Sequence, residues 1–331
     1  GDLYRRRTDI VGFVNGIPLL FIELKKNTVD VQDAYTNNYT DYLDTIPHLF
    51  YYNAFLILSN GTEAKVGTLG SKYEFFHEWK RLSEQEQGSV ALETMLRGIC
   101  KKENFLDLLE NFILFDHSGG HTAKILARNH QYLGVNEAIK AYEARKLNNG
   151  KLGVFWHTQG SGKSLTMVWF SKWILENNPN ARVLVVTDRE ELDEQIEKNY
   201  KGVDENIVRT KSGKDLLERL NVFDDRLLCS LVHKFGKRGS DSSETDYEKY
   251  IEDLKNALPK DFSAKGDIVV FVDECHRTQS GKLHAAMKTI LPNAIFIGFT
   301  GTPLLKKDKE TSLETFGGYI HTYKFNEGVR D

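Results

Sequence analysis

The residues with the clearest capacity for chemistry form a glycine-rich loop that follows an apolar run. The loop reads His157-Thr158-Gln159-Gly160-Ser161-Gly162-Lys163-Ser164, and an amphipathic segment follows it. Backbone N–H groups of such a loop point at phosphate oxygens, the lysine ammonium reaches the outer phosphates, and the serine hydroxyl can bind Mg²⁺ at the positive end of the next helix. We therefore predict a phosphate site made of Thr158, Gly160, Ser161, Gly162, Lys163 and Ser164.

This loop departs at one position from the pattern G-x-x-x-x-G-K-[ST]. His157 stands where the first glycine would fall, so the turn from strand to loop lacks its usual residue. Gly160 and Gly162 still keep the backbone open to phosphate. A glycine- and serine-rich turn that binds nothing is the alternative interpretation of this segment.

Two carboxylates follow a second apolar run further along the chain. The run from Asp267 to Val272 is rich in β-branched residues and leads into Asp273-Glu274-Cys275-His276. Such a run is typical of a parallel strand buried on both faces, and parallel sheets bind ligands at the carboxyl ends of their strands. We expect Asp273 to bind Mg²⁺ from the side opposite Ser164, and Glu274 to orient the water that attacks a γ-phosphate. A core strand followed by a solvated acidic loop is the alternative.

A third group of reactive side chains lies near the start of the chain. Asn15-Gly16 separates two apolar runs and predicts a hairpin, because both turn positions accept positive φ. Pairing across this turn would bring Asp9 close to Glu23, and Lys25 would share a face with Glu23. Two carboxylates and an ammonium on one face can hold Mg²⁺, activate water and offset charge on a phosphodiester. An exposed hairpin edge with ordinary charged residues is the alternative.

The order of the later segments resembles the motor ATPases of helicase superfamily 2. Residues 273–276 are similar to the box that names that family, and residues 295–303 are similar to its third motif. The resemblance implies that Gln131 reads adenine, with a surface glutamine as the alternative, and that Arg277 serves the nucleotide site through contacts between motifs. It also implies further segments of the same domain at Val183 to Arg189 and at Leu227 to Phe235.

The hairpin residues resemble the catalytic core of the PD-(D/E)xK nucleases, with Asp9, Glu23 and Lys25 as Asp…Glu-x-Lys. Thr8 replaces the proline of that pattern. Asn38-x-x-x-Tyr42 resembles the Gln-x-x-x-Tyr element of the RecB-like branch, with Asn in place of Gln. A nuclease hairpin followed by a superfamily 2 motor is similar to the R (restriction and translocation) subunit of type I restriction-modification enzymes.

This resemblance implies an α/β protein in which a PD-(D/E)xK nuclease domain precedes a RecA-like, doubly wound parallel-sheet P-loop domain. We expect the nuclease domain, with a helical connector, at residues 1–117 and the first motor lobe at 118–331. The polar run from Asp116 to His121 marks the expected boundary. A second motor lobe and the start of the nuclease fold are expected to lie outside this chain.

The implied activities are ATP-dependent DNA translocation and Mg²⁺-dependent endonucleolytic cleavage, with double-stranded DNA and the methylation (M) and specificity (S) subunits as partners. A superfamily 2 repair or remodelling helicase with a degenerate, DNA-binding nuclease-like domain is the first alternative, and a nucleotide-gated scaffold is the second. The implied catalytic residues are Asp9, Glu23, Lys25, Lys163 and Glu274, and the implied Mg²⁺ ligands are Asp9, Glu23, Ser164 and Asp273.

Composition agrees with a globular protein of about two domains. The 331 residues are 40% hydrophobic and 27% charged, which is ordinary for such a protein. The formal charge of −3 gives no global attraction to DNA, so any contact with DNA must come from local basic clusters. Arg5-Arg6-Arg7 and Lys25-Lys26 are the candidates, and ordinary solvated faces are the alternative. Three cysteines without metal-ligand spacing, and no apolar stretch of spanning length, favour a cytoplasmic protein with unpaired thiols and no membrane contact.

Overall fold

The computed structural model describes residues 5–83, 86, 92–187, 190–231, 256, 258–275, 284, 287–302 and 314–324. Its backbone forms two compact units, residues 1–133 and residues 134–330. Helix α4, Asn129–Glu143, contains the division between them. The domain boundary expected at residue 117 stays a prediction. The polar run expected to mark it forms the turn of an antiparallel hairpin between β5, Ile113–Asp116, and β6, Ala123–Leu126.

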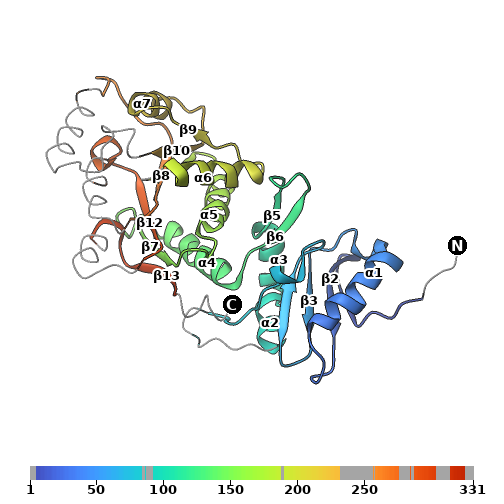
Figure 1. Ribbon diagram of the computed structural model, residues 1–331. Coiled ribbons are helices and arrows are strands. Elements are labelled where there is room, and N and C mark those ends of the chain that lie inside the picture. The colour runs from blue at the N-terminus through green and yellow to red at the C-terminus, as the bar shows by residue number, and fades with distance from the viewer. Residues whose placement is uncertain are drawn as a thin grey trace. The chain divides into compact units, whose positions relative to one another are not determined.

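The first unit is built on a four-stranded sheet in the order β1-β2-β3-β4 (Figure 1). The β1–β2 and β3–β4 pairs are antiparallel, whereas β2 and β3 run parallel. The predicted hairpin between β1 and β2 is confirmed, because Asn15 and Gly16 adopt φ values of 50° and 81°, as a two-residue type I′ turn requires. The strands span Ile10–Val14 (β1), Ile17–Leu24 (β2), Phe55–Ser59 (β3) and Ala64–Gly67 (β4).

Helices cover both faces of this sheet. On one face, the ring centroid of Phe21 from β2 lies 5.8 Å from Tyr42 and 5.1 Å from Phe50. On the other face, Phe55 of β3 packs 5.1 Å from Phe105. Because side chains alternate along a strand, Glu23 points to the same face as Phe21. The elements are the π-helix η1 (Ala34–Tyr39), α1 (Thr40–Thr45), the 3₁₀ helices η2 (Pro47–Phe50) and η3 (Tyr73–Phe75), α2 (Leu92–Ile99) and α3 (Lys102–Asn111).

The second unit contains a seven-stranded sheet in the order β13-β7-β12-β11-β8-β10-β9. Every neighbouring pair is parallel, which confirms the α/β class with a parallel sheet. The carboxyl ends of all these strands therefore meet at one edge. The strands span Lys151–His157 (β7), Ala181–Thr187 (β8), Val208–Arg209 (β9), Leu227–Leu231 (β10), Asp267–Val272 (β11), Ile295–Thr300 (β12) and Tyr319–Tyr323 (β13).

Helices cover both faces of this sheet as well (Figure 1). Helix α5, Lys163–Asn177, lies on one face, where its Phe170 stacks on Phe271 of β11 with centroids 5.5 Å apart. Helix α6, Glu190–Gly202, joins α5 through a 3.0 Å hydrogen bond from Ser171 to Tyr200. The opposite face buries three leucines of α7, Gly213–Asn221, against residues of β8, β10, β11 and β12.

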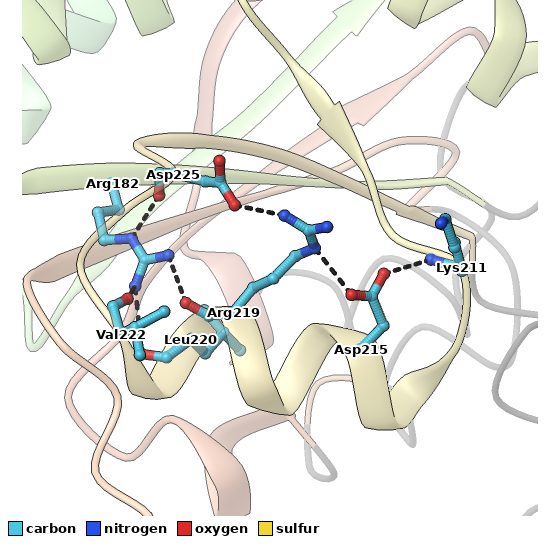
Figure 2. Close-up of polar contacts among 7 residues, drawn as sticks. All are labelled: Arg182, Lys211, Asp215, Arg219, Leu220, Val222 and Asp225. Atoms are coloured by element: carbon cyan, nitrogen blue, oxygen red, sulfur yellow. Dashed lines mark hydrogen bonds and ion pairs between the residues drawn. The ribbon is translucent and has the colours of Figure 1, made fainter.

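One buried arginine fixes the end of α7, as Figure 2 shows. Arg182 of β8 is 1% exposed, and within the described ranges it donates only to backbone carbonyls. Three of these acceptors, Arg219, Leu220 and Val222, lie at the carboxyl end of α7, where the helix dipole concentrates negative charge. Asp225 and Lys265 supply two more acceptors, at 2.7 Å and 3.2 Å. The guanidinium therefore replaces water as the partner of the last carbonyls of the helix.

None of the described helices is both long enough and apolar enough to cross a membrane. Among the described residues, Cys100, Cys229 and Cys275 form no disulfide bond. Residues 240–248, which are polar in sequence, lie outside the described residues, as do Asp188, Arg189 and residues 232–235.

We predict that Arg182→Met lowers the free energy of unfolding of the second unit by about 3 kcal/mol or more, because several buried carbonyls lose their donor at once. Arg182→Lys should recover only part of this loss, since an ammonium is a point charge and lacks the planar fork of donors. Urea unfolding followed by circular dichroism measures both. Lys214→Ala is the control, because Lys214 lies on α7 with 83% of its side chain exposed and should change stability by less than about 0.5 kcal/mol.

Candidate nucleotide and nuclease sites

The glycine-rich loop connects the carboxyl end of β7 to the start of α5. Gly160 and Gly162 have φ values of 84° and 81°, in the left-handed region that favours glycine. Gly162 is the residue that caps α5, and Lys163 is the first residue of the helix. The loop also closes on itself, since the Ser161 N–H donates to the Thr158 carbonyl at 3.1 Å. Strand, loop and helix thus have the connectivity that a phosphate-binding loop requires.

His157, which stands in place of the first glycine, is a core residue. It is fully buried, and its Nε2 lies 2.9 Å from Nδ1 of His321 on β13. The next residue, Thr158, donates its backbone N–H to the Tyr323 carbonyl at 3.1 Å. The start of the loop is therefore fixed to β13. The sequence interpretation missed His321, although a histidine inside the apolar run Tyr319–Tyr323 was a signal for a buried polar partner.

Lys163 brings the loop and the carboxylates after β11 together. Its Nζ lies 2.9 Å from Asp273 Oδ1 and 2.7 Å from Glu274 Oε1. Burial by itself would lower the pKa of Lys163, but the charges of Asp273 and Glu274 outweigh burial and raise this pKa. Burial raises the pKa of Asp273, although the Lys163 ammonium opposes that shift. Asp273 is only 6% exposed, so the alternative of a solvated acidic loop is wrong.

The end of β12 lies against the same cluster. The Gly301 N–H is 3.5 Å from Glu274 Oε2. A Cβ at Gly301 would lie 3.7 Å from Glu274 Oε1 and 3.8 Å from the Gln159 nitrogen. Thr300 donates its hydroxyl to the Thr302 carbonyl at 3.0 Å and so stiffens the turn. Three segments that are distant in sequence therefore meet at the carboxyl edge of the sheet.

The other residues predicted for nucleotide binding differ in how the structure bears on them. Ser161 is buried, and Ser164 is partly buried in the first turn of α5. Gln131 is 2% exposed and its Oε1 accepts the Arg128 N–H at 2.9 Å, so the alternative of a surface glutamine is wrong. Its role in reading adenine stays a prediction. Arg277 lies outside the described residues.

The hairpin of the first unit places Asp9 beside the end of β2. Ile10 pairs with Ile22, and Asp9 Oδ2 accepts the Leu24 N–H at 2.8 Å. Glu23 lies between Ile22 and Leu24 on β2. It is 2% exposed, so the alternative of an exposed hairpin edge with ordinary charged residues is excluded for Glu23. Its Oε2 atom is buried and has no hydrogen-bond partner among the described residues. An orphaned carboxylate oxygen next to a second carboxylate fits a cation that completes the site.

Lys25 and the helix that follows complete this group. The Lys25 ammonium donates a hydrogen bond to Asn38 Oδ1, and the Lys25 N–H donates to the Ser59 carbonyl of β3 at 2.7 Å. Asn38 belongs to the π-helix η1, a form that is often found at functional sites. Tyr42, four residues on, donates its hydroxyl to the Arg7 carbonyl at 3.0 Å. The Asn38-x-x-x-Tyr42 element therefore orients Lys25 and fixes the chain before Asp9.

The electrostatics of Glu23 match a site that lacks a positive charge. Its pKa is raised to about 7, chiefly by burial and then by the negative charge of Asp9, while Lys25 acts in the opposite direction. Among the described residues, no three His, Cys, Asp or Glu side chains cluster closely enough to form a metal centre by themselves. A cation at either site would thus depend on water or phosphate for its remaining ligands, as is usual for Mg²⁺.

The geometry agrees with the family to which the chain belongs. Residues 130–331 match the model of the SWI2/SNF2 ATPase, which covers most of the chain, so the protein belongs to the SWI2/SNF2 ATPase family. Residues 2–75 match the model of the type I restriction enzyme R protein N terminus. The chain therefore joins the N-terminal region of a type I restriction R protein to a SWI2/SNF2 ATPase lobe.

Relatives over the whole chain are endonuclease subunits of type I restriction enzymes. The HindI subunit of Haemophilus influenzae is 34% identical over 99% of this chain and 32% of its own length. The MjaIXP subunit of Methanocaldococcus jannaschii, named as putative, is 30% identical over 98% of this chain and 32% of its own length. The chain thus spans about a third of the length of these curated relatives.

A solved structure with weaker similarity is the UvsW helicase of bacteriophage T4. It is 16% identical, with a TM-score of 0.43 over 66% of this chain and 67% of that chain. The Sulfolobus solfataricus SWI2/SNF2 ATPase core in complex with double-stranded DNA is 17% identical, with a TM-score of 0.41 over 63% of this chain and 38% of that chain.

We predict that Glu23→Gln stabilises the metal-free protein at pH 8 but not at pH 4. A carboxyl group whose pKa rises from 4.5 to about 7 on folding favours folding below 4.5, and this contribution is lost as pH rises through about 7. This pKa rise corresponds to a difference of roughly 3 kcal/mol in the free energy of unfolding between low and high pH. Thermal unfolding in EDTA across this pH range measures it for both proteins.

The control for this measurement is Glu74→Gln, because the Glu74 side chain is 65% exposed in the same unit. This variant should follow the pH dependence of the unmodified chain. Parallel stability curves for Glu23→Gln and the unmodified chain would show that Glu23 ionises normally and would remove the electrostatic case for a cation beside it.

Proposed function

We propose that the chain is the motor and nuclease portion of a type I restriction subunit. In this role it hydrolyses ATP to translocate double-stranded DNA and cleaves that DNA with Mg²⁺, in an assembly with methylation and specificity subunits. The observation that carries the proposal is a lysine next to buried carboxylates in each unit, Lys163 with Asp273 in one and Lys25 with Glu23 in the other. Each set suits phosphate chemistry, and the two sets are independent in sequence and in structure.

The first unit has the residues for phosphodiester hydrolysis. Its sheet, with a hairpin, a parallel third strand and helices on both faces, supports a PD-(D/E)xK nuclease fold. Asp9 and Glu23 would hold Mg²⁺, which when bound lowers the pKa of a water molecule and offsets phosphate charge. Lys25, oriented by Asn38, would stabilise the charge that develops on the attacked phosphate.

The second unit has the residues for ATP hydrolysis. Its parallel sheet supports a RecA-like lobe, in which backbone N–H groups from Gly160 to Lys163 cradle the phosphates of ATP. The Lys163 ammonium would exchange its contacts with Asp273 and Glu274 for the outer phosphates. That exchange frees Glu274 to orient the attacking water, and leaves Asp273 with Ser164 to hold Mg²⁺.

A repair or remodelling helicase with a degenerate nuclease-like domain is the competing function, since Thr8 and Asn38 depart from the nuclease pattern. The hydrogen bond from Lys25 to Asn38 speaks against degeneration, because phosphodiester cleavage would use an oriented ammonium whose charge acts on Glu23. Incubation of the full-length subunit with M and S subunits, DNA, ATP and Mg²⁺ separates the two. ATP hydrolysis without any cleavage would favour the helicase.

We predict that Glu23→Ala or Lys25→Ala in the full-length subunit lowers DNA cleavage by at least about 100-fold and leaves DNA-stimulated ATP hydrolysis within about twofold, because the two reactions use different residues. Nicking of supercoiled plasmid and release of phosphate, followed in one reaction, measure the two activities. Glu74→Ala, an exposed carboxylate of the same unit, is the matched control and should retain both. Cleavage retained by both site variants would mean that other residues carry it.

We also predict that Lys163→Ala impairs nucleotide binding, whereas Glu274→Gln impairs turnover. Lys163 holds phosphate in the ground state, so its loss should weaken binding of a non-hydrolysable ATP analogue at least about tenfold and abolish both activities. Glu274 acts as water attacks, so its amide variant should bind the analogue within about threefold of normal but turn over ATP at least about 100-fold more slowly. Titration calorimetry and a phosphate assay provide the readouts, and equal losses of affinity would contradict the separate roles.

A further inference from the structure

A buried hydroxyl that has no hydrogen-bond partner among the described residues lies at the carboxyl edge of the motor sheet. Thr187 is the last residue of β8, and it is fully buried. Within the described part of the chain, its Oγ1 makes no hydrogen bond. Such a group has lost its hydrogen bonds to water without replacement, so it destabilises the folded state. Buried polar groups are nearly always paired, and this exception therefore calls for a reason.

The register of the sheet places Thr187 next to Asp273. Val186 of β8 pairs with Val272 of β11, and the Asp273 N–H donates to the Val186 carbonyl at 2.9 Å. The following residues on the two strands, Thr187 and Asp273, are therefore neighbours across the parallel pair. Neighbours in register on adjacent strands point their side chains to the same face of a sheet.

That shared face is the one covered by α5. Phe271 stacks on Phe170 of α5, and Val185 lies opposite Phe271 in register. Because side chains alternate along β8, Thr187, two residues beyond Val185, points to the same layer. Lys163 reaches Asp273 from the first turn of α5. The orphaned hydroxyl, the carboxylate and the ammonium thus belong to one layer of the structure.

The contacts of Asp273 leave room for another donor. Lys163 Nζ at 2.9 Å and the Glu274 N–H at 3.0 Å both contact Oδ1. Asp273 is 6% exposed. Once the Lys163 ammonium moves to nucleotide phosphates, this buried carboxylate loses its countercharge. A buried carboxylate in this condition needs new hydrogen-bond donors or a cation. By register, the unused hydroxyl of Thr187 lies beside Asp273, at the end of the neighbouring strand.

We propose that Thr187 is a positioning residue for Asp273 in the nucleotide-bound state. Its hydroxyl donates to the Asp273 carboxylate when Lys163 transfers to the phosphates, and this bond aims the remaining lone pairs of Asp273 at the cation that accompanies the nucleotide. The inference rests on the nucleotide site of the proposed function. It also gives the orphaned hydroxyl a purpose, because the group is unsatisfied only while Lys163 neutralises Asp273.

The test uses Thr187→Val, which removes the hydroxyl and keeps the shape, and Thr187→Ser, which keeps the hydroxyl. Binding of a non-hydrolysable ATP analogue to the chain is measured by calorimetry with Mg²⁺ and with EDTA, and thermal unfolding is measured without nucleotide. Thr187→Val should melt at the same or a higher temperature, bind about tenfold more weakly with Mg²⁺, and bind within twofold of normal in EDTA. Thr187→Ser should bind normally with Mg²⁺.

Thr210→Val is the matched control, because Thr210 is equally buried but donates to Ser230 at 2.9 Å. It should melt at a lower temperature and keep normal affinity, which is the behaviour of a purely structural hydroxyl. The same behaviour from Thr187→Val, or a serine variant as weak as the valine variant, would overturn the inference. Lys163→Ala, measured alongside, separates the failures: unchanged binding there would overturn the nucleotide site itself, and this inference with it.

Discussion

The ion cluster of Lys163, Asp273 and Glu274 is the interaction on which the motor site depends. It exists only because a parallel sheet brings the loop after β7 and the carboxylates after β11 to one edge, with the end of β12 beside them. Asp273 is too buried to be satisfied by solvent, so its charge requires a partner in every state. Binding of nucleotide therefore becomes an exchange of partners, in which Lys163 leaves and other donors must replace it.

The two candidate sites solve the same electrostatic problem differently. In the motor unit, the ammonium contacts both carboxylates and opposes the rise that burial causes in the pKa of Asp273. In the first unit, Asn38 holds the Lys25 ammonium, and the pKa of Glu23 stays raised to about 7. The first site is therefore short of positive charge at neutral pH. Arg182 shows a third solution, because its buried guanidinium donates to backbone carbonyls.

Much of this could be predicted from residue patterns because local physics fixes it. Asn15-Gly16 determines the hairpin, since both positions must take positive φ, and the hairpin alone brings Asp9 to Glu23. The β-branched runs before Asp273 and before Asp188 determine buried parallel strands, whose ends carry the polar residues. The glycines of the phosphate loop are required by the left-handed backbone that they adopt.

Tertiary structure alone decided the contacts between residues that are far apart in sequence. His157 was recognisable as a departure from the loop pattern, but only β13 supplies His321 to bury it. Asn38 became the partner of Lys25 because the π-helix packs over the sheet, and the neighbourhood of Thr187 and Asp273 follows from the β8–β11 register. Side-chain type and spacing define which groups can react, whereas strand order and register determine which of them meet, because those depend on the burial of whole sheet faces.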